Sequence, residues 1–251
     1  MAHTDDKHSL ERYPMRLFFA VICSQLVSVS GLPAAEPEYR LADPDLELVL
    51  VDSSPDQSFL SMRTDTSGRL FVGAREAVFV YEPDGKGGLL PRREVYRFPA
   101  DSWVYDIEIR GRDLYAMTNR ALYLLPGAVT RRSEIAPRRL VWGHPDYHPH
   151  QCFHGLAWGP DGDLYLSLGD MLVFYGDFTR PDHWGHWTFF CQPEGTRVPY
   201  TGVGGVLRCR PDGSRLRVVA RGTRNSCGLV FDSRWNLFTH DNDHEGLPLD
   251  Y

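Results

Sequence analysis

The feature that most constrains the fold is a short pattern that occurs four times along the 251-residue chain. Each copy has a polar turn, then a leucine followed by an aromatic residue, then a short apolar run. The copies are DTSGRLFVG, IRGRDLYAM, GPDGDLYLS and DSRWNLFTH, and their leucines are Leu70, Leu114, Leu164 and Leu237, which lie 44, 50 and 73 residues apart. No long amphipathic helix pattern accompanies the copies, so the pattern indicates an all-β repeat fold.

Another strand-like segment follows each of the first three copies: AVFVYEPDG, ALYLLPG and GVLRCRPDG. A period of ~40–50 residues with about four short strands is typical of β-propeller blades. We therefore predict a β-propeller of four-stranded blades, in preference to an all-β sandwich. The 73-residue interval predicts one blade with an insertion at 171–203. About three and a half blades fit into 36–251, and closed rings have ~4–8 blades, so we expect a fragment of a longer reading frame.

The first 35 residues differ from the repeats. Arg16, the apolar run Leu17–Val27 and the small residues that follow predict a signal peptide, whose apolar core is too short for a stable membrane span. The charged residues before Met15 indicate a mis-called extension. A buried N-terminal helix is the alternative. We thus expect 1–35 to be an extension plus signal peptide, 36–251 to be an incomplete propeller, and the protein to be periplasmic or secreted.

Charge and cysteine usage narrow the possible partners. The net charge is −6 and no long basic run occurs, which argues against a nucleic acid partner. Export would leave four cysteines in the mature chain, and none lies in a Cys-x-x-Cys pair that could mark a structural zinc or haem site. One disulfide is favoured over four free thiols, with the pairing open. The four are Cys152, Cys191, Cys209 and Cys227.

Three stretches together resemble the soluble aldose (glucose/sorbosone) dehydrogenase family: HGLAWGPDGDLYLSLGD, GGVLRCRPDGS and GTRNSCGLVF. The resemblance covers roughly residues 151–243. The HWGHWTFFC insertion makes the chain more similar to a large set of membrane-bound dehydrogenases of planctomycete-type bacteria. Members of the aldose dehydrogenase family are six-bladed propellers that use pyrroloquinoline quinone (PQQ) and calcium. The resemblance therefore implies an exported quinoprotein-like dehydrogenase that oxidises a sugar or alcohol, with a cytochrome-type electron acceptor as a possible partner.

The resemblance also implies site residues. The family's catalytic histidine lies ten residues before the Asp of the GPD turn, where this chain has Gln151, flanked by His150 and His154. A neutral histidine suits removal of the proton of a sugar hydroxyl, so both histidines are candidates for the catalytic base. Arg224 would stabilise negative charge on the quinone oxygens. The implied cofactor-binding residues are Arg224, Asn225, Gln151 and Asp170.

Calcium prefers several oxygen ligands, and the sequence HDNDHE offers Asp241, Asn242 and Asp243. A solvated acidic loop is the alternative for this stretch. Eight of the ten histidines lie between His144 and His244, which keeps a transition-metal site open, although no spacing matches a known ligand set. The aromatic residues of the insertion suit stacking on a sugar or quinone, or a small satellite core. The alternative function is a non-catalytic propeller that binds carbohydrate or a protein partner.

Overall fold

The computed structural model describes residues 42–43, 46, 48–54, 57–143, 152–169, 188–193, 195, 197–200 and 204–241. The chain divides into two compact units, Met1–Asp56 and Gln57–Tyr251, and all the strands belong to the second. Within the described ranges no segment forms a helix long and apolar enough to cross a membrane. The predicted signal peptide lies outside these ranges, as do five predicted site residues: His150, Gln151, Asp170, Asn242 and Asp243.

The second unit consists of successive antiparallel sheets that we call blades A to D. Blade A contains β1 (Phe59–Thr64), β2 (Leu70–Ala74), β3 (Ala77–Tyr81) and β4 (Arg93–Arg97) in that spatial order. Blade B contains β5 (Val104–Arg110), β6 (Asp113–Thr118), β7 (Ala121–Leu125) and β8 (Arg138–Trp142). Blade C contains β9 (Phe153–Trp158), β10 (Leu164–Leu168), β13 (Gly204–Cys209) and β14 (Arg217–Thr223). Blade D is described as the hairpin β15 (Cys227–Phe231) and β16 (Leu237–His240).

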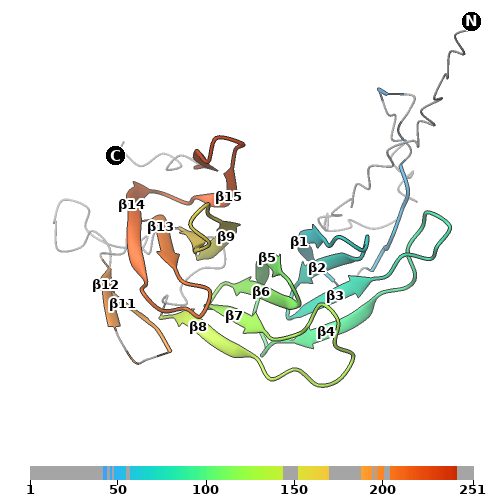
Figure 1. Cartoon of the computed structure of the whole chain (residues 1–251), viewed down its shortest axis with the longest axis horizontal. Helices are drawn as coiled ribbons and strands as arrows, with labels where there is room; N and C mark the ends of the chain where they lie inside the picture. Colours follow the sequence, from blue (N-terminus) through green and yellow to red (C-terminus); the bar gives the residue numbers. More distant parts are fainter. Residues whose placement is uncertain are drawn as a thin grey trace, which may run out of the picture. The chain divides into compact units, whose positions relative to one another are not determined.

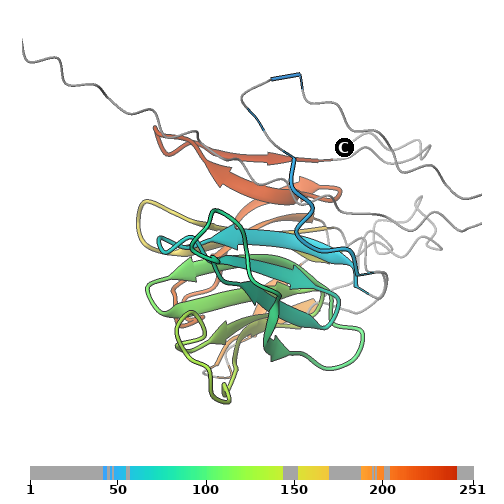
Figure 2. The ribbon, with the colours of Figure 1, turned by 90° about the vertical axis from the view of Figure 1, so that its right-hand side faces the viewer.

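The first strands of the blades lie towards a common centre, and the fourth strands lie at the periphery (Figure 1). Seen from the side, the turns that connect the strands gather at the two ends of the sheets (Figure 2). All regular elements of the described residues are β-strands. The predicted all-β fold of four-stranded propeller blades is confirmed, and each predicted leucine begins or lies next to the start of a second strand.

The insertion in blade C contributes strands to a different blade. The hairpin β11 (Thr188–Cys191) and β12 (Arg197–Tyr200) lies between β10 and β13 in the chain. It joins blade B, where Cys191 pairs with Trp142 of β8, so the sheet of blade B has six strands. The side chain of Gln192 accepts a hydrogen bond from the Leu216 amide (2.8 Å), which ties this hairpin back to blade C.

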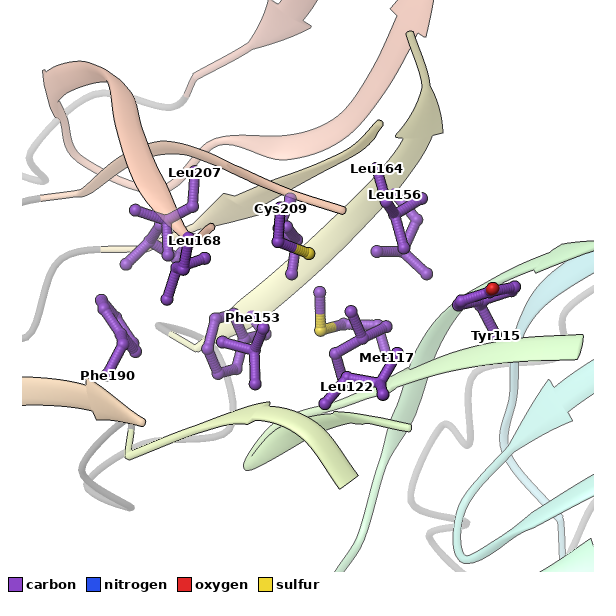
Figure 3. Packing of buried hydrophobic residues seen from close by; sticks show 14 of the residues in the cluster. Tyr115, Met117, Leu122, Phe153, Leu156, Leu164, Leu168, Phe190, Leu207 and Cys209 are labelled. Carbon is purple, nitrogen blue, oxygen red and sulfur yellow. The ribbon is translucent and has the colours of Figure 1, made fainter. Parts of the chain in front are cut away.

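The aromatic residue of each repeat packs onto the blade that follows. Phe71, Tyr115 and Tyr165 are buried, and each lies in a core cluster with residues of the next blade. Figure 3 shows one of these clusters, in which Met117 and Leu122 of blade B face leucines of blade C. Burying such a side chain contributes about 1.5–3 kcal/mol, so the repeated aromatic stabilises the stacking of the blades. In blade D the equivalent residue, Phe238, is 52% exposed.

Candidate functional site

All four innermost strands carry a β-bulge near their N-terminal end. The register slips between Phe59 and Ser61 in β1 and between Val104 and Asp106 in β5. In β9, two residues lie opposite a single residue of β10, and in β15, two residues lie opposite a single residue of β16. Bulges redirect side chains and are frequent next to active sites. The residues at the bulges are Leu60 in β1, Tyr105 in β5, His154 and Gly155 in β9, and Gly228 and Leu229 in β15.

The bulges of blades B and C bring His154 and Tyr105 together. Their ring centroids are 5.0 Å apart, with the planes at 68°. Trp103 stacks on Tyr105 at 6.3 Å, and the Tyr105 hydroxyl shares a hydrogen bond with the thiol of Cys152. Burial, followed by the charge interaction with Cys152, raises the pKa of Tyr105, which therefore stays protonated at neutral pH. We call these four residues the His154 cluster.

Unpartnered polar atoms concentrate in one segment between blades C and D. Six buried side-chain oxygen or nitrogen atoms of the described residues have no hydrogen-bond partner, and four of them belong to consecutive residues. Buried polar atoms are almost always paired, so this segment is where a bound water, ion or ligand would supply the missing hydrogen-bond partners. The four atoms are Thr223 Oγ1, Arg224 Nε, Asn225 Oδ1 and Ser226 Oγ. We call Thr223–Ser226 the polar segment.

The polar segment lies at the same end of the inner strands as the His154 cluster. Gly169 links the two, because its amide donates to the Cys152 carbonyl (2.8 Å) while its backbone bridges to Asn225. The inner strands β9 and β15 also touch: a Cβ on Gly155 would lie 2.6 Å from Gly228 Cα. Glycine at 155 therefore permits the approach that places β15 beside His154.

Charged side chains that are at least partly buried connect the inner strands of blades A, B and C. Arg63 of β1 lies 3.3 Å from a carboxylate oxygen of Asp106 and 2.9 Å from one of Glu108, both on β5. Asp106 also accepts a hydrogen bond from the amide of Leu156 on β9 (2.8 Å). Burial raises the pKa of Asp106 and of Glu108, and the nearby guanidinium only partly opposes the shift. One arginine thus faces two carboxylates of the neighbouring inner strand and links β1 to β5.

The predicted site residues that lie within the described ranges fall into two groups. His154, Arg224 and Asn225 lie at the site described above, with His154 and Asn225 buried. Asp241 is exposed, and both its carboxylate oxygens accept hydrogen bonds from backbone amides of the polar segment. Among the described residues no three histidine, cysteine or carboxylate side chains come together in a group that could hold a metal.

The favoured disulfide is absent from the structure. None of the four cysteines of the predicted mature chain forms a disulfide. Cys209 is buried among the apolar residues between blades B and C, and burial raises the pKa of its thiol. Cys152 instead belongs to the His154 cluster. The surroundings of these two cysteines could not be predicted from the sequence, because cysteine spacing carries no information about which side chains meet across blades.

Sequence reasoning missed Tyr105, Trp103, Thr223 and Ser226. A signal for Tyr105 was available: it lies 9 residues before Leu114, and His154 lies 10 residues before Leu164. An alignment of the repeats on their leucines would have placed the two rings one position apart, close to the start of the first strand of each blade. The unpartnered atoms of Thr223 and Ser226 have no such signal, since they depend on burial by the neighbouring blade.

No protein-family model and no curated protein sequence matches this chain. Among solved structures, the chain is similar to the PQQ domain of pyranose dehydrogenase from Coprinopsis cinerea, with 18% identity, a TM-score of 0.49, and coverage of 73% of this chain and 43% of that one. It is also similar to a virginiamycin B lyase from Staphylococcus aureus, with 14% identity, a TM-score of 0.43, and coverage of 77% and 52%. The chain spans about half the length of these structures. They are too distant to assign an activity.

Proposed function

We propose that this chain is the part of an exported quinoprotein-like dehydrogenase that binds PQQ and oxidises a sugar or alcohol. The observation that carries the proposal is the row of four unpartnered polar atoms in Thr223–Ser226, near the buried His154 of the neighbouring inner strand β9. The same residues, Arg224 and Asn225, are those for which the resemblance to the aldose dehydrogenases implies cofactor contacts. A cytochrome-type electron acceptor and a periplasmic or secreted location are part of this proposal.

The residues present fit a planar quinone that bears carboxylates. Arg224 Nε is a buried donor without a partner, and a carboxylate or quinone oxygen is the kind of acceptor it lacks. Asn225 Oδ1 is a buried acceptor, and the hydroxyls of Thr223 and Ser226 can donate or accept. When bound, PQQ supplies an acceptor for the hydride of the substrate carbon.

The chain's own residues supply the proton chemistry. The imidazole of His154 takes the proton of the substrate hydroxyl, and His150 is the second candidate for this base. Tyr105 packs against the His154 ring, and Trp103 in turn stacks on Tyr105. Calcium is proposed at Asp241, Asn242 and Asp243. An ionised carboxylate has about four lone-pair positions, so Asp241 can bind a cation beside the two amides that it already accepts.

The test is binding of PQQ, with and without calcium, followed by tryptophan fluorescence and by thermal unfolding. We expect PQQ to raise the melting temperature of the purified chain, and Arg224→Gln to abolish the shift. Arg217→Gln is the matched control, because Arg217 is exposed at the far end of β14. Reduction of a dye acceptor with a sugar and PQQ then tests catalysis. Stabilisation by a sugar alone, with no response to PQQ, would contradict the proposal and favour a carbohydrate-binding propeller.

A further inference from the structure

Asp241 is the first residue after β16, and its side chain reaches back to the polar segment. Its Oδ2 accepts a hydrogen bond from the Arg224 amide (2.8 Å), and its Oδ1 accepts one from the Asn225 amide (2.6 Å). Hydrogen bonds to an ionised carboxylate are roughly twice as strong as neutral ones. One side chain thus fixes two successive residues that carry unpartnered polar atoms.

Blade B uses the equivalent position in the same way. Asn119 is the first residue after β6, as Asp241 is after β16. The Asn119 side-chain oxygen accepts a hydrogen bond from the Trp103 amide (3.0 Å), and its amide group donates to the Asp101 carbonyl (3.1 Å). In both blades the side chain of the residue that follows the second strand forms hydrogen bonds with the backbone just before the first strand begins. We call this arrangement the clasp. In blade B this clasp holds Trp103 of the His154 cluster.

The clasp explains why the polar atoms of the segment are left for a ligand. The amides of Arg224 and Asn225 are occupied by Asp241, and the Asn225 carbonyl accepts a hydrogen bond from the Cys227 thiol (3.2 Å). The backbone therefore has little freedom to rotate and bring the side chains to other partners. A binding group that is held in place before the ligand arrives loses less conformational entropy when it binds.

We propose that Asp241 is a positioning residue, whose carboxylate holds Arg224 and Asn225 in the orientation that binds the ligand; for PQQ as that ligand, this rests on the function proposed above. Asp241→Ala removes both hydrogen bonds, and we expect PQQ binding to weaken about tenfold or more when it is measured without calcium, so that the proposed calcium site does not contribute. Asp241→Asn keeps one oxygen acceptor and can retain only one of the two hydrogen bonds, so its affinity should lie between those of the original chain and Asp241→Ala.

The matched control is Asp232→Ala. Asp232 makes the same kind of contact at the opposite end of the hairpin, where its Oδ1 accepts from the amides of Arg234 and Asn236 (2.9 and 2.8 Å). This variant should lower the melting temperature while PQQ affinity stays within about twofold of the original, since its contacts lie away from the site. Equal losses of affinity in Asp232→Ala and Asp241→Ala would overturn the proposal, because both would then act through stability alone.

Hydrogen exchange without ligand separates this proposal from the proposed function. We expect the amides of Arg224 and Asn225 to exchange slowly in the original chain and faster in Asp241→Ala, but not in Asp232→Ala. If Asp241→Ala exchanges faster but the original chain does not bind PQQ, the role of Asp241 is supported and the proposed binding of PQQ is refuted. Unchanged exchange in Asp241→Ala would overturn the clasp whatever the outcome with PQQ.

Discussion

The turn between β15 and β16 places a tryptophan where the other turns have glycine. In blades A, C and D the turn between the first two strands has the same hydrogen-bond pattern, in which the amide of the fourth residue donates to the carbonyl of the first and the fourth residue has a positive φ. That residue is Gly68 in blade A, Gly162 in blade C and Trp235 in blade D, with φ of 76°, 76° and 64°. A residue with a Cβ pays about 1–2 kcal/mol for this left-handed conformation.

The strain can be measured by comparing Trp235→Ala with Trp235→Gly. Both variants lose the contact of the indole ring with Phe231, so their difference reports the backbone alone. Glycine removes the strain of about 1–2 kcal/mol but costs about 0.5–1 kcal/mol of extra chain entropy. We therefore expect Trp235→Gly to be more stable than Trp235→Ala by about 0.5–1 kcal/mol.

The assay is urea unfolding followed by circular dichroism, which does not depend on the lost tryptophan. The control pair is Arg234→Ala and Arg234→Gly, one residue earlier, where φ is not positive. There the alanine variant should be the more stable by about 0.4–1 kcal/mol, the opposite sign. If Trp235→Gly is no more stable than Trp235→Ala, the argument from the shared turn geometry is wrong.

Three further outcomes follow from the packing and the charges. Gly155→Ala should destabilise the chain by about 1–3 kcal/mol in urea unfolding, because the new methyl would clash with the backbone of Gly228; an unchanged midpoint would show that β9 and β15 do not touch. Tyr165→Ala should lower the free energy of unfolding by about 3–5 kcal/mol and Phe238→Ala by less than about 1 kcal/mol, because only the Tyr165 ring is covered by a following blade. Equal losses in the two variants would contradict this reasoning. The pKa of Asp106 is raised above 3.8 in the folded chain, so its contribution to stability is present below pH 3.8 and is lost as pH rises through the folded-state value. Asp106→Asn should therefore show a smaller decline of the unfolding free energy with rising pH in that window, and an unaltered pH profile would refute the assignment.

Much of the fold follows from local chemistry that the sequence displays. The turns at Asp65–Arg69 and Asp232–Asn236 form because an aspartate side chain accepts hydrogen bonds from amides two and four residues later. The leucine that follows is apolar and begins a strand, so turn and strand recur together. Such features depend on residues near in the chain, and they predicted the number and type of the blades.

The insertion shows where this reasoning stops. The sequence placed it between the strands of blade C but did not indicate where it pairs, and its hairpin pairs with β8 of blade B through Cys191 and Trp142. Strand pairing across blades depends on which edge is free in space. Spacing along the chain does not contain that information.

For the candidate site, the sequence by itself determined which residue types were available: His154, Arg224 and Asn225, through the resemblance of their surroundings. Only the tertiary structure decided their surroundings, because it covered Asn225 and the Arg224 Nε atom and left their polar atoms without partners. It also placed Tyr105 against His154 and brought the Asp241 carboxylate to the position where it accepts hydrogen bonds from two backbone amides. Burial and hydrogen-bond partners are properties of neighbours that are distant in sequence, and those neighbours meet only when the blades pack.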